Sequence, residues 1–96
     1  MDAAVEVAAY TIAAEALSNA RRHSVAGLVE LTATDRGDSI EVTVRDNGVG
    51  VPVRPRAGVG MVSMRDRAAE VGGRLDVEPT PGGGTTVRAT LPRTVA

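Results

Sequence analysis

The apolar positions at the start of the chain follow the period of an α-helix. From Ala3 to His23, apolar residues recur at the i, i+3, i+4 and i+7 spacing that gives a helix one apolar face. Asp2 stands where a helix cap is expected, and neither Pro nor Gly interrupts the segment. The sequence therefore predicts one long amphipathic helix whose buried face comprises Val5, Ala8, Ala9, Ile12, Ala13, Ala16, Leu17 and Ala20.

The following residues alternate between apolar and polar with the period of a strand. Two such runs, Leu28 to Thr34 and Ile40 to Arg45, are separated by a polar turn that contains Gly37. We expect a β-hairpin.

The second half repeats this order after a long loop. Gly48 to Gly60 is rich in Gly and Pro and has no periodicity, whereas Val59 to Val71 is helical and ends at two glycines. Leu75 to Glu78 and Thr85 to Leu91 read as strands. This order predicts an α+β fold: a two-layer α/β sandwich in which a mixed, mostly antiparallel sheet carries both helices on one face.

Composition narrows the class of protein. The 96 residues, 43% of them hydrophobic, suit one domain over residues 1–96, with an aliphatic core because Tyr10 is the only aromatic residue. A net charge of -1 gives no basic footprint for nucleic acid, and the absence of Cys excludes disulfides and thiolate catalysis. No apolar run approaches the roughly 20 residues that span a bilayer, so we expect a cytoplasmic domain without direct membrane contact.

A carboxylate and a glycine turn follow the second predicted strand, in the run Asp46-Asn47-Gly48-Val49-Gly50. A buried carboxylate needs hydrogen-bond donors, and an adenine amino group is one such donor. The same residues are also typical of an ordinary tight turn. The run alone leaves both interpretations open.

Polar residues also line one row of the first helix. Glu15, Asn19 and His23 are spaced by four, so they share a face, and carboxylate and amide oxygens suit a hydrated Mg²⁺ beside phosphates. A solvated polar helix face is the alternative.

Two further glycine-rich segments are compatible with a ligand. Gly58 and Gly60 precede the second helix, where backbone amides can bind phosphate, and Gly82-Gly83-Gly84 precede Thr85 and Thr86. A flexible loop and a mobile hairpin are the corresponding alternatives.

Taken in order, these segments closely resemble the ATP-binding catalytic domain of bacterial sensor histidine kinases. That domain has the Bergerat-type fold of the superfamily that includes gyrase, heat-shock chaperone and mismatch-repair ATPases. Glu15 to Ser24 resembles the family's N box, and the glycine boxes are matched by Asp46 to Gly50, Gly58 to Arg67 and Gly82 to Thr86. The short loop and the run Met64-Arg65-Asp66-Arg67 resemble the nitrate and envelope-stress sensors.

The resemblance implies a role for each matched residue at the base. Asp46 would accept a hydrogen bond from the adenine amino group, and Gly48 and Gly50 would shape the turn beside it. Thr85 would bind adenine through water, and Thr86 belongs to the same nucleotide-binding box.

The resemblance also implies roles for the residues near the phosphates of the nucleotide. Asn19 would ligate Mg²⁺, Glu15 would act as the catalytic residue that positions the metal or a water, and His23 would contact the phosphates. Gly58 and Gly60 would supply backbone amides. The lid would run from Pro52 to Ala57, with Arg54 and Arg56 as phosphate contacts.

As a function, the resemblance implies Mg²⁺-ATP binding and transfer of the γ-phosphate to a histidine on a separate dimerisation domain of the parent protein, with a response regulator as the indirect partner. That domain and the strand pair that usually precedes the first helix are missing, so we expect an N-terminally truncated piece that binds ATP without completing autophosphorylation. A serine kinase of the anti-sigma factor type and a non-catalytic interaction module are the alternatives.

Overall fold

The computed structural model describes residues 2–23, 28–46, 59–79 and 84–94. Within these ranges the elements follow one another as α1 (Ala3–His23), β1 (Val29–Asp35), β2 (Ser39–Asp46), α2 (Val59–Glu70), β3 (Arg74–Pro79) and β4 (Thr85–Pro92). None of the helices in these ranges combines the length and hydrophobicity needed to cross a membrane.

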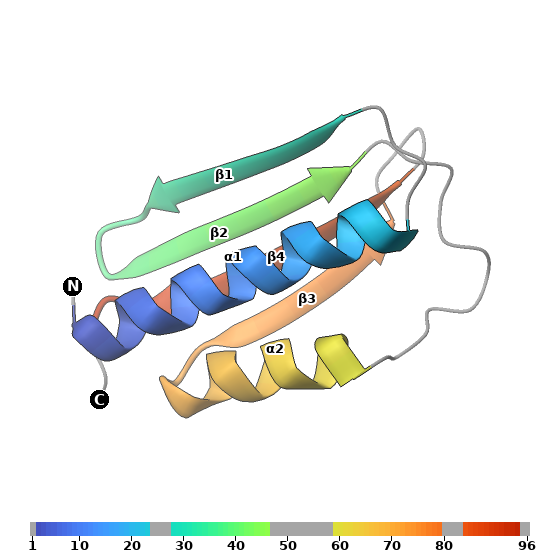
Figure 1. Cartoon of the computed structure of the whole chain (residues 1–96). Helices are drawn as coiled ribbons and strands as arrows, with labels where there is room; N and C mark the ends of the chain where they lie inside the picture. Colours follow the sequence, from blue (N-terminus) through green and yellow to red (C-terminus); the bar gives the residue numbers. More distant parts are fainter. Residues whose placement is uncertain (1, 24–27, 47–58, 80–83, 95–96) are drawn as a thin grey trace.

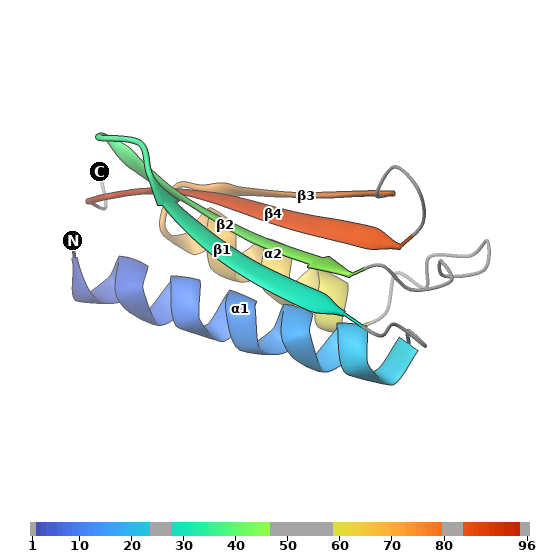
Figure 2. The ribbon, with the colours of Figure 1, turned by 90° about the horizontal axis from the view of Figure 1, so that it is seen from above.

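The four described strands form one sheet in the order β1-β2-β4-β3. Both helices lie on the same face of it, as the two views in Figures 1 and 2 show. The predicted two-layer α+β sandwich is thus confirmed. The sheet differs from the prediction in one respect, because every described pair is antiparallel where a mixed sheet was expected. The physical reason is that β1–β2 and β3–β4 are both hairpins and that β2 and β4 also join in antiparallel fashion.

Helix α1 begins where the sequence predicted. The Asp2 carbonyl accepts hydrogen bonds from the Val5 and Glu6 amides, each at 3.0 Å, so Asp2 occupies the cap position. Along the helix, five of the residues expected on the apolar face are buried: Val5, Ala8, Ile12, Ala16 and Ala20. Ala9, Ala13 and Leu17 pack beside them and are partly buried.

Helix α2 ends in a Schellman motif at the two glycines. Gly72 adopts a φ of 83°, the left-handed region that glycine enters without steric cost. Its amide donates to the Ala69 carbonyl at 2.9 Å, and the Gly73 amide donates to the Ala68 carbonyl at 2.8 Å. These bonds satisfy helix carbonyls and turn the chain directly into β3.

The core lies between the helices and the inner face of the sheet. Strands β2 and β4 supply its centre, since Ile40, Val42 and Val44 pair with Leu91, Ala89 and Val87 in register. Its largest fully buried side chains are those of Ile12, Met64, Leu91 and Val5. The core is entirely aliphatic, as the composition predicted.

Strand β1 differs from the simple alternating strand that its sequence suggested. None of its seven residues is buried, although Leu31 stands opposite the buried Val44. Leu31 is 50% exposed because β1 forms the edge of the sheet, and the two helices lie over the other strands (Figure 1).

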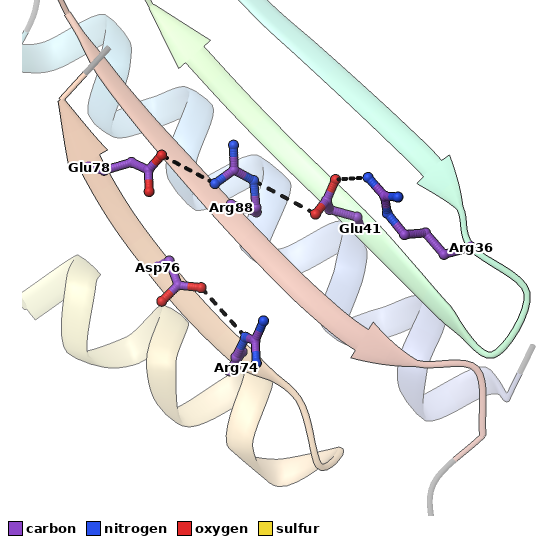
Figure 3. Close-up of polar contacts among 6 residues, drawn as sticks. All are labelled: Arg36, Glu41, Arg74, Asp76, Glu78 and Arg88. Atoms are coloured by element: carbon purple, nitrogen blue, oxygen red, sulfur yellow. Dashed lines mark hydrogen bonds and ion pairs between the residues drawn. The ribbon is translucent and has the colours of Figure 1, made fainter. Parts of the chain in front are cut away.

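The outer face of the sheet carries a row of charged side chains (Figure 3). The Arg88 guanidinium contacts Glu41 at 3.7 Å and Glu78 at 3.3 Å, and Glu41 also contacts Arg36 at 3.1 Å. The row therefore links β2, β4 and β3. Each exposed pair of this kind contributes about 1 kcal/mol or less.

The two ends of the described chain are tied together at one end of the sandwich. The Asp2 amide donates to the Arg93 carbonyl at 3.1 Å, and the Arg93 amide donates to the Asp38 carbonyl at 3.1 Å. The Arg93 guanidinium also contacts the Asp35 carboxylate. The Gly37 amide, and then Arg93, hold the pKa of Asp35 below its ordinary value of 3.8.

Leucines on β4 and β1 test which strand carries the core. Leu91 is fully buried, so Leu91→Ala should lower the free energy of unfolding by about 2–5 kcal/mol. The matched control Leu31→Ala should cost about 1 kcal/mol or less, because Leu31 is half exposed. Urea titrations followed by far-ultraviolet circular dichroism measure both values, and equal losses would contradict this arrangement.

Candidate functional site

The residues that the sequence singled out come from elements that meet at one end of the sandwich. Figures 1 and 2 show the C-terminal end of α1, the end of β2, the start of β4 and the start of α2 at this end. The antiparallel pairing causes the meeting, because the last residues of β2 lie beside the first residues of β4. The chain termini lie at the opposite end.

Asp46 is the last residue of β2 and lies on its helix-covered face. It follows Ile40, Val42 and Val44 at the spacing of two that keeps side chains on one face, and it is only 8% exposed. The Thr85 amide donates a hydrogen bond to the Asp46 Oδ1 at 3.3 Å. The structure thus holds a nearly buried hydrogen-bond acceptor at the end of a central strand.

Gly84 allows the start of β4 to come this close to Asp46. A Cβ atom at this position would lie 1.9 Å from the Asp46 carbonyl oxygen and 2.9 Å from its Oδ1. Gly84 also has a φ of 99°, which side chains disfavour. The sequence marked three consecutive glycines but gave no signal as to which one makes the close contact, so the individual role of Gly84 was missed.

The two threonines of the third glycine box lie on different faces of the sheet. The register pairs Thr86 with Arg45 and with Glu78, so the pleat puts Thr86 on the outer face. Thr85, one residue earlier, shares the inner face with Asp46. The structure therefore brings Thr85 to Asp46 but directs Thr86 away from it, although Thr86 is itself buried.

One row of side chains along α1, formed by Ala8, Ile12, Glu15 and Asn19, becomes polar and less buried towards this end. Ala8 and Ile12 are buried, whereas Glu15 and Asn19, which continue the row at spacings of three and four, are half-buried. The row thus passes from the core to a partly accessible position near the end that holds Asp46. His23 is the last residue of α1.

Glu15 and Asn19 fit the donor set of a magnesium ion. Both offer oxygen atoms, which Mg²⁺ prefers, and neither is enclosed in the core. Within the part of the chain that the structure describes, no three His, Cys, Asp or Glu residues group as a metal site. An ion at Glu15 and Asn19 would therefore complete its shell with water and phosphate oxygens.

Gly60 lies in the first turn of α2, whose N-terminal end faces the same end of the sandwich. The other residues predicted for this region, Gly48, Gly50, Gly58 and the lid from Pro52 to Ala57 with its two arginines, lie outside the described residues. Their roles stay predictions.

The fold is a two-layer α+β sandwich, and comparison with known proteins identifies the family to which the chain belongs. The family model described as "Histidine kinase-, DNA gyrase B-, and HSP90-like ATPase" matches residues 4–95. The chain therefore belongs to this family, as the four motifs predicted.

Its relatives are sensor histidine kinases. The chain is 43% identical over 83 residues to the nitrate/nitrite sensor protein NarX of Escherichia coli K12. This match covers 83% of the chain and 14% of NarX. It is 30% identical over 92 residues to the signal transduction histidine-protein kinase/phosphatase DegS of Brevibacillus brevis, covering 94% of the chain and 24% of DegS. The chain thus spans a small part of each of these sensors.

Solved structures of histidine kinases share the fold. The histidine kinase domain of the blue-light activated kinase EL346 from Erythrobacter litoralis matches with a TM-score of 0.73 at 27% identity, over 85% of this chain and 42% of that one. The ATP-binding domain of PrrB from Mycobacterium tuberculosis matches with a TM-score of 0.68 at 29% identity. The match covers 86% of this chain and 64% of that one. The predicted likeness to nitrate-type sensors is confirmed.

Proposed function

We propose that this chain binds Mg²⁺-ATP at the end of the sandwich and serves as the catalytic domain of a two-component sensor histidine kinase. The observation that carries the proposal is the Asp46 carboxylate, which is 8% exposed and bonded to the neighbouring strand. It lies at the end of the sandwich where α1 also ends, and Glu15 and Asn19 belong to the C-terminal half of that helix. Membership of the ATPase family supports the nucleotide, and similarity to sensor kinases supports the reaction class.

At the base, Asp46 would accept a hydrogen bond from the adenine amino group. A carboxylate is a good partner for this donor because it only accepts and because burial removes competing water. Thr85 shares its face of the sheet and could add a contact through water.

At the phosphates, Asn19 would ligate Mg²⁺ and Glu15 would position the ion or a water. When bound, the ion supplies positive charge that offsets the phosphate charges during transfer. Gly60 lies in the first turn of α2, where backbone amides and the helix dipole favour an anion. The chain's own contribution would be positioning and charge stabilisation.

The phosphate acceptor would be a histidine on a separate dimerisation domain of the same parent protein. In this reaction a ring nitrogen of that histidine attacks the γ-phosphorus, the bond to the bridging oxygen breaks, and ADP leaves. A response regulator would then take the phosphate from the histidine. Because the reaction consumes cellular ATP, the domain would act in the cytoplasm.

Removal of the Asp46 carboxylate tests the base contact. Asp46→Ala should weaken ATP binding by about 10- to 100-fold, since a hydrogen bond to a charged group contributes about 1.5–3 kcal/mol. Isothermal titration calorimetry with ATP and Mg²⁺ measures the change. Asp76→Ala, which removes an exposed carboxylate of β3, is the matched control and should bind as the wild type does. Undiminished binding by Asp46→Ala, or no binding by the wild type, would refute the proposal.

Asn19 tests the metal contact separately. Asn19→Ala should remove about tenfold of the ATP affinity in Mg²⁺ buffer, or ~1.4 kcal/mol, and should change affinity little when the metal is chelated. The same titrations with and without EDTA separate the part of the ATP affinity that depends on Mg²⁺ from the part that does not. Ser18→Ala, at a neighbouring half-buried position on α1, serves as the control. An Mg²⁺ dependence that survives in Asn19→Ala argues against this ligand.

The chemistry of the phosphorylated residue tests the acceptor. After incubation of the full-length parent protein with labelled ATP, we expect a phosphate that is lost in acid and stable in base, as a phosphohistidine is. An acid-stable label would instead indicate a serine acceptor.

A further inference from the structure

The hydrogen bond from the Thr85 amide distinguishes two oxygens of the Asp46 carboxylate that are otherwise chemically equivalent. The Thr85 amide donates to one named oxygen, Oδ1, at 3.3 Å, and the backbone of Gly84 lies directly against the same residue. The two oxygens of a carboxylate are chemically equivalent, so either orientation presents an acceptor. A donor fixed on one of them matters only when the two atoms differ.

We propose that the backbone at Gly84 and Thr85 fixes the orientation of the side chain at position 46, so that one defined atom of that side chain faces the purine. This inference rests on the proposed nucleotide binding and adds the element that orients the side chain expected to meet the base. Gly84 and Thr85 act here as positioning residues, since they work through Asp46.

The register explains why Thr85 is the residue that supplies the donor. Arg45 and Thr86 are the last described partners of β2 and β4, so the next step along the ladder brings Asp46 opposite Thr85. Because Asp46 ends its strand, its side chain receives the amide of the facing residue. The donor is therefore built into the sheet and does not depend on a side-chain rotamer.

Gly84 keeps this donor within reach. A Cβ at this position would overlap the Asp46 carbonyl oxygen at 1.9 Å, and that oxygen is backbone and cannot rotate away. Any other residue would force the start of β4 away from the end of β2. The Thr85 amide would then withdraw from the side chain at position 46.

An asparagine at position 46 reveals the orientation. If the Thr85 backbone amide donates to this asparagine, the side-chain oxygen of the asparagine must face that donor, because two donors facing each other repel. The side-chain nitrogen then takes the position of the second carboxylate oxygen. The site would thus change from presenting an acceptor to presenting a donor, which suits the 6-keto oxygen of hypoxanthine and opposes the 6-amino group of adenine.

Calorimetric titrations of wild type and Asp46→Asn with ATP and with ITP, both with Mg²⁺, test this inference. The wild type should prefer ATP by about tenfold or more. Asp46→Asn should reverse the order and prefer ITP by about threefold to tenfold. Asp46→Ala, which offers neither donor nor acceptor, should bind both weakly and nearly equally. Circular dichroism establishes that each variant is folded.

A second measurement removes only the donor. An ester bond in place of the amide between Gly84 and Thr85 deletes the N–H while keeping both side chains, and it avoids the steric conflict that Gly84→Ala would introduce. In the Asp46→Asn background, this ester should abolish the preference for ITP, because the side-chain amide can then rotate by half a turn.

The outcomes separate this inference from the function on which it rests. A folded wild-type chain that binds neither nucleotide contradicts ATP binding itself. If the wild type binds ATP, the inference is overturned by an Asp46→Asn variant that still prefers ATP or binds neither nucleotide, and also by a preference for ITP that survives the ester.

Discussion

The antiparallel pairing of β2 with β4 is the interaction on which the rest of this domain depends. It joins strands that are far apart in the sequence, Ser39–Asp46 and Thr85–Pro92, and it makes one sheet of two hairpins. The same register unites the core, through pairs such as Val42 with Ala89, and the site, through Asp46 and Thr85. A slip of one residue would turn every β4 side chain to the other face, so core and site would be lost together.

The two faces of the sheet favour this register for different reasons. On the inner face, apolar side chains must meet the helices, and a slip of one residue would turn them towards solvent. On the outer face, Arg88 lies between Glu41 and Glu78 and contacts a strand on either side. These exposed ion pairs add little energy, but a shifted strand would remove their opposite-charge neighbours. Stability therefore comes from one face, and the other face adds specificity.

Local signals in the sequence predicted most of the fold, and they also marked the candidate site residues. The bounds of α1 followed from its period and from Asp2, and the end of α2 followed from its paired glycines. The strand order did not follow, because alternation shows which face a strand buries and not which strand lies beside it. For the same reason the exposure of β1 was not foreseen.

The site shows the same division between local and long-range information. Asp46, Glu15 and Asn19 stood out from their positions in motifs, whereas the contact of Gly84 with Asp46 depends on two strands meeting. The outward direction of Thr86 depends on the parity of the pleat at the start of β4.

The two ends of the described chain lie close together, since the Asp2 amide and the Arg93 carbonyl meet at 3.1 Å. The two ends could therefore be joined by a short peptide and the chain reopened at an exposed turn such as Arg36–Gly37, giving a circular permutant that leaves the end with Asp46 intact.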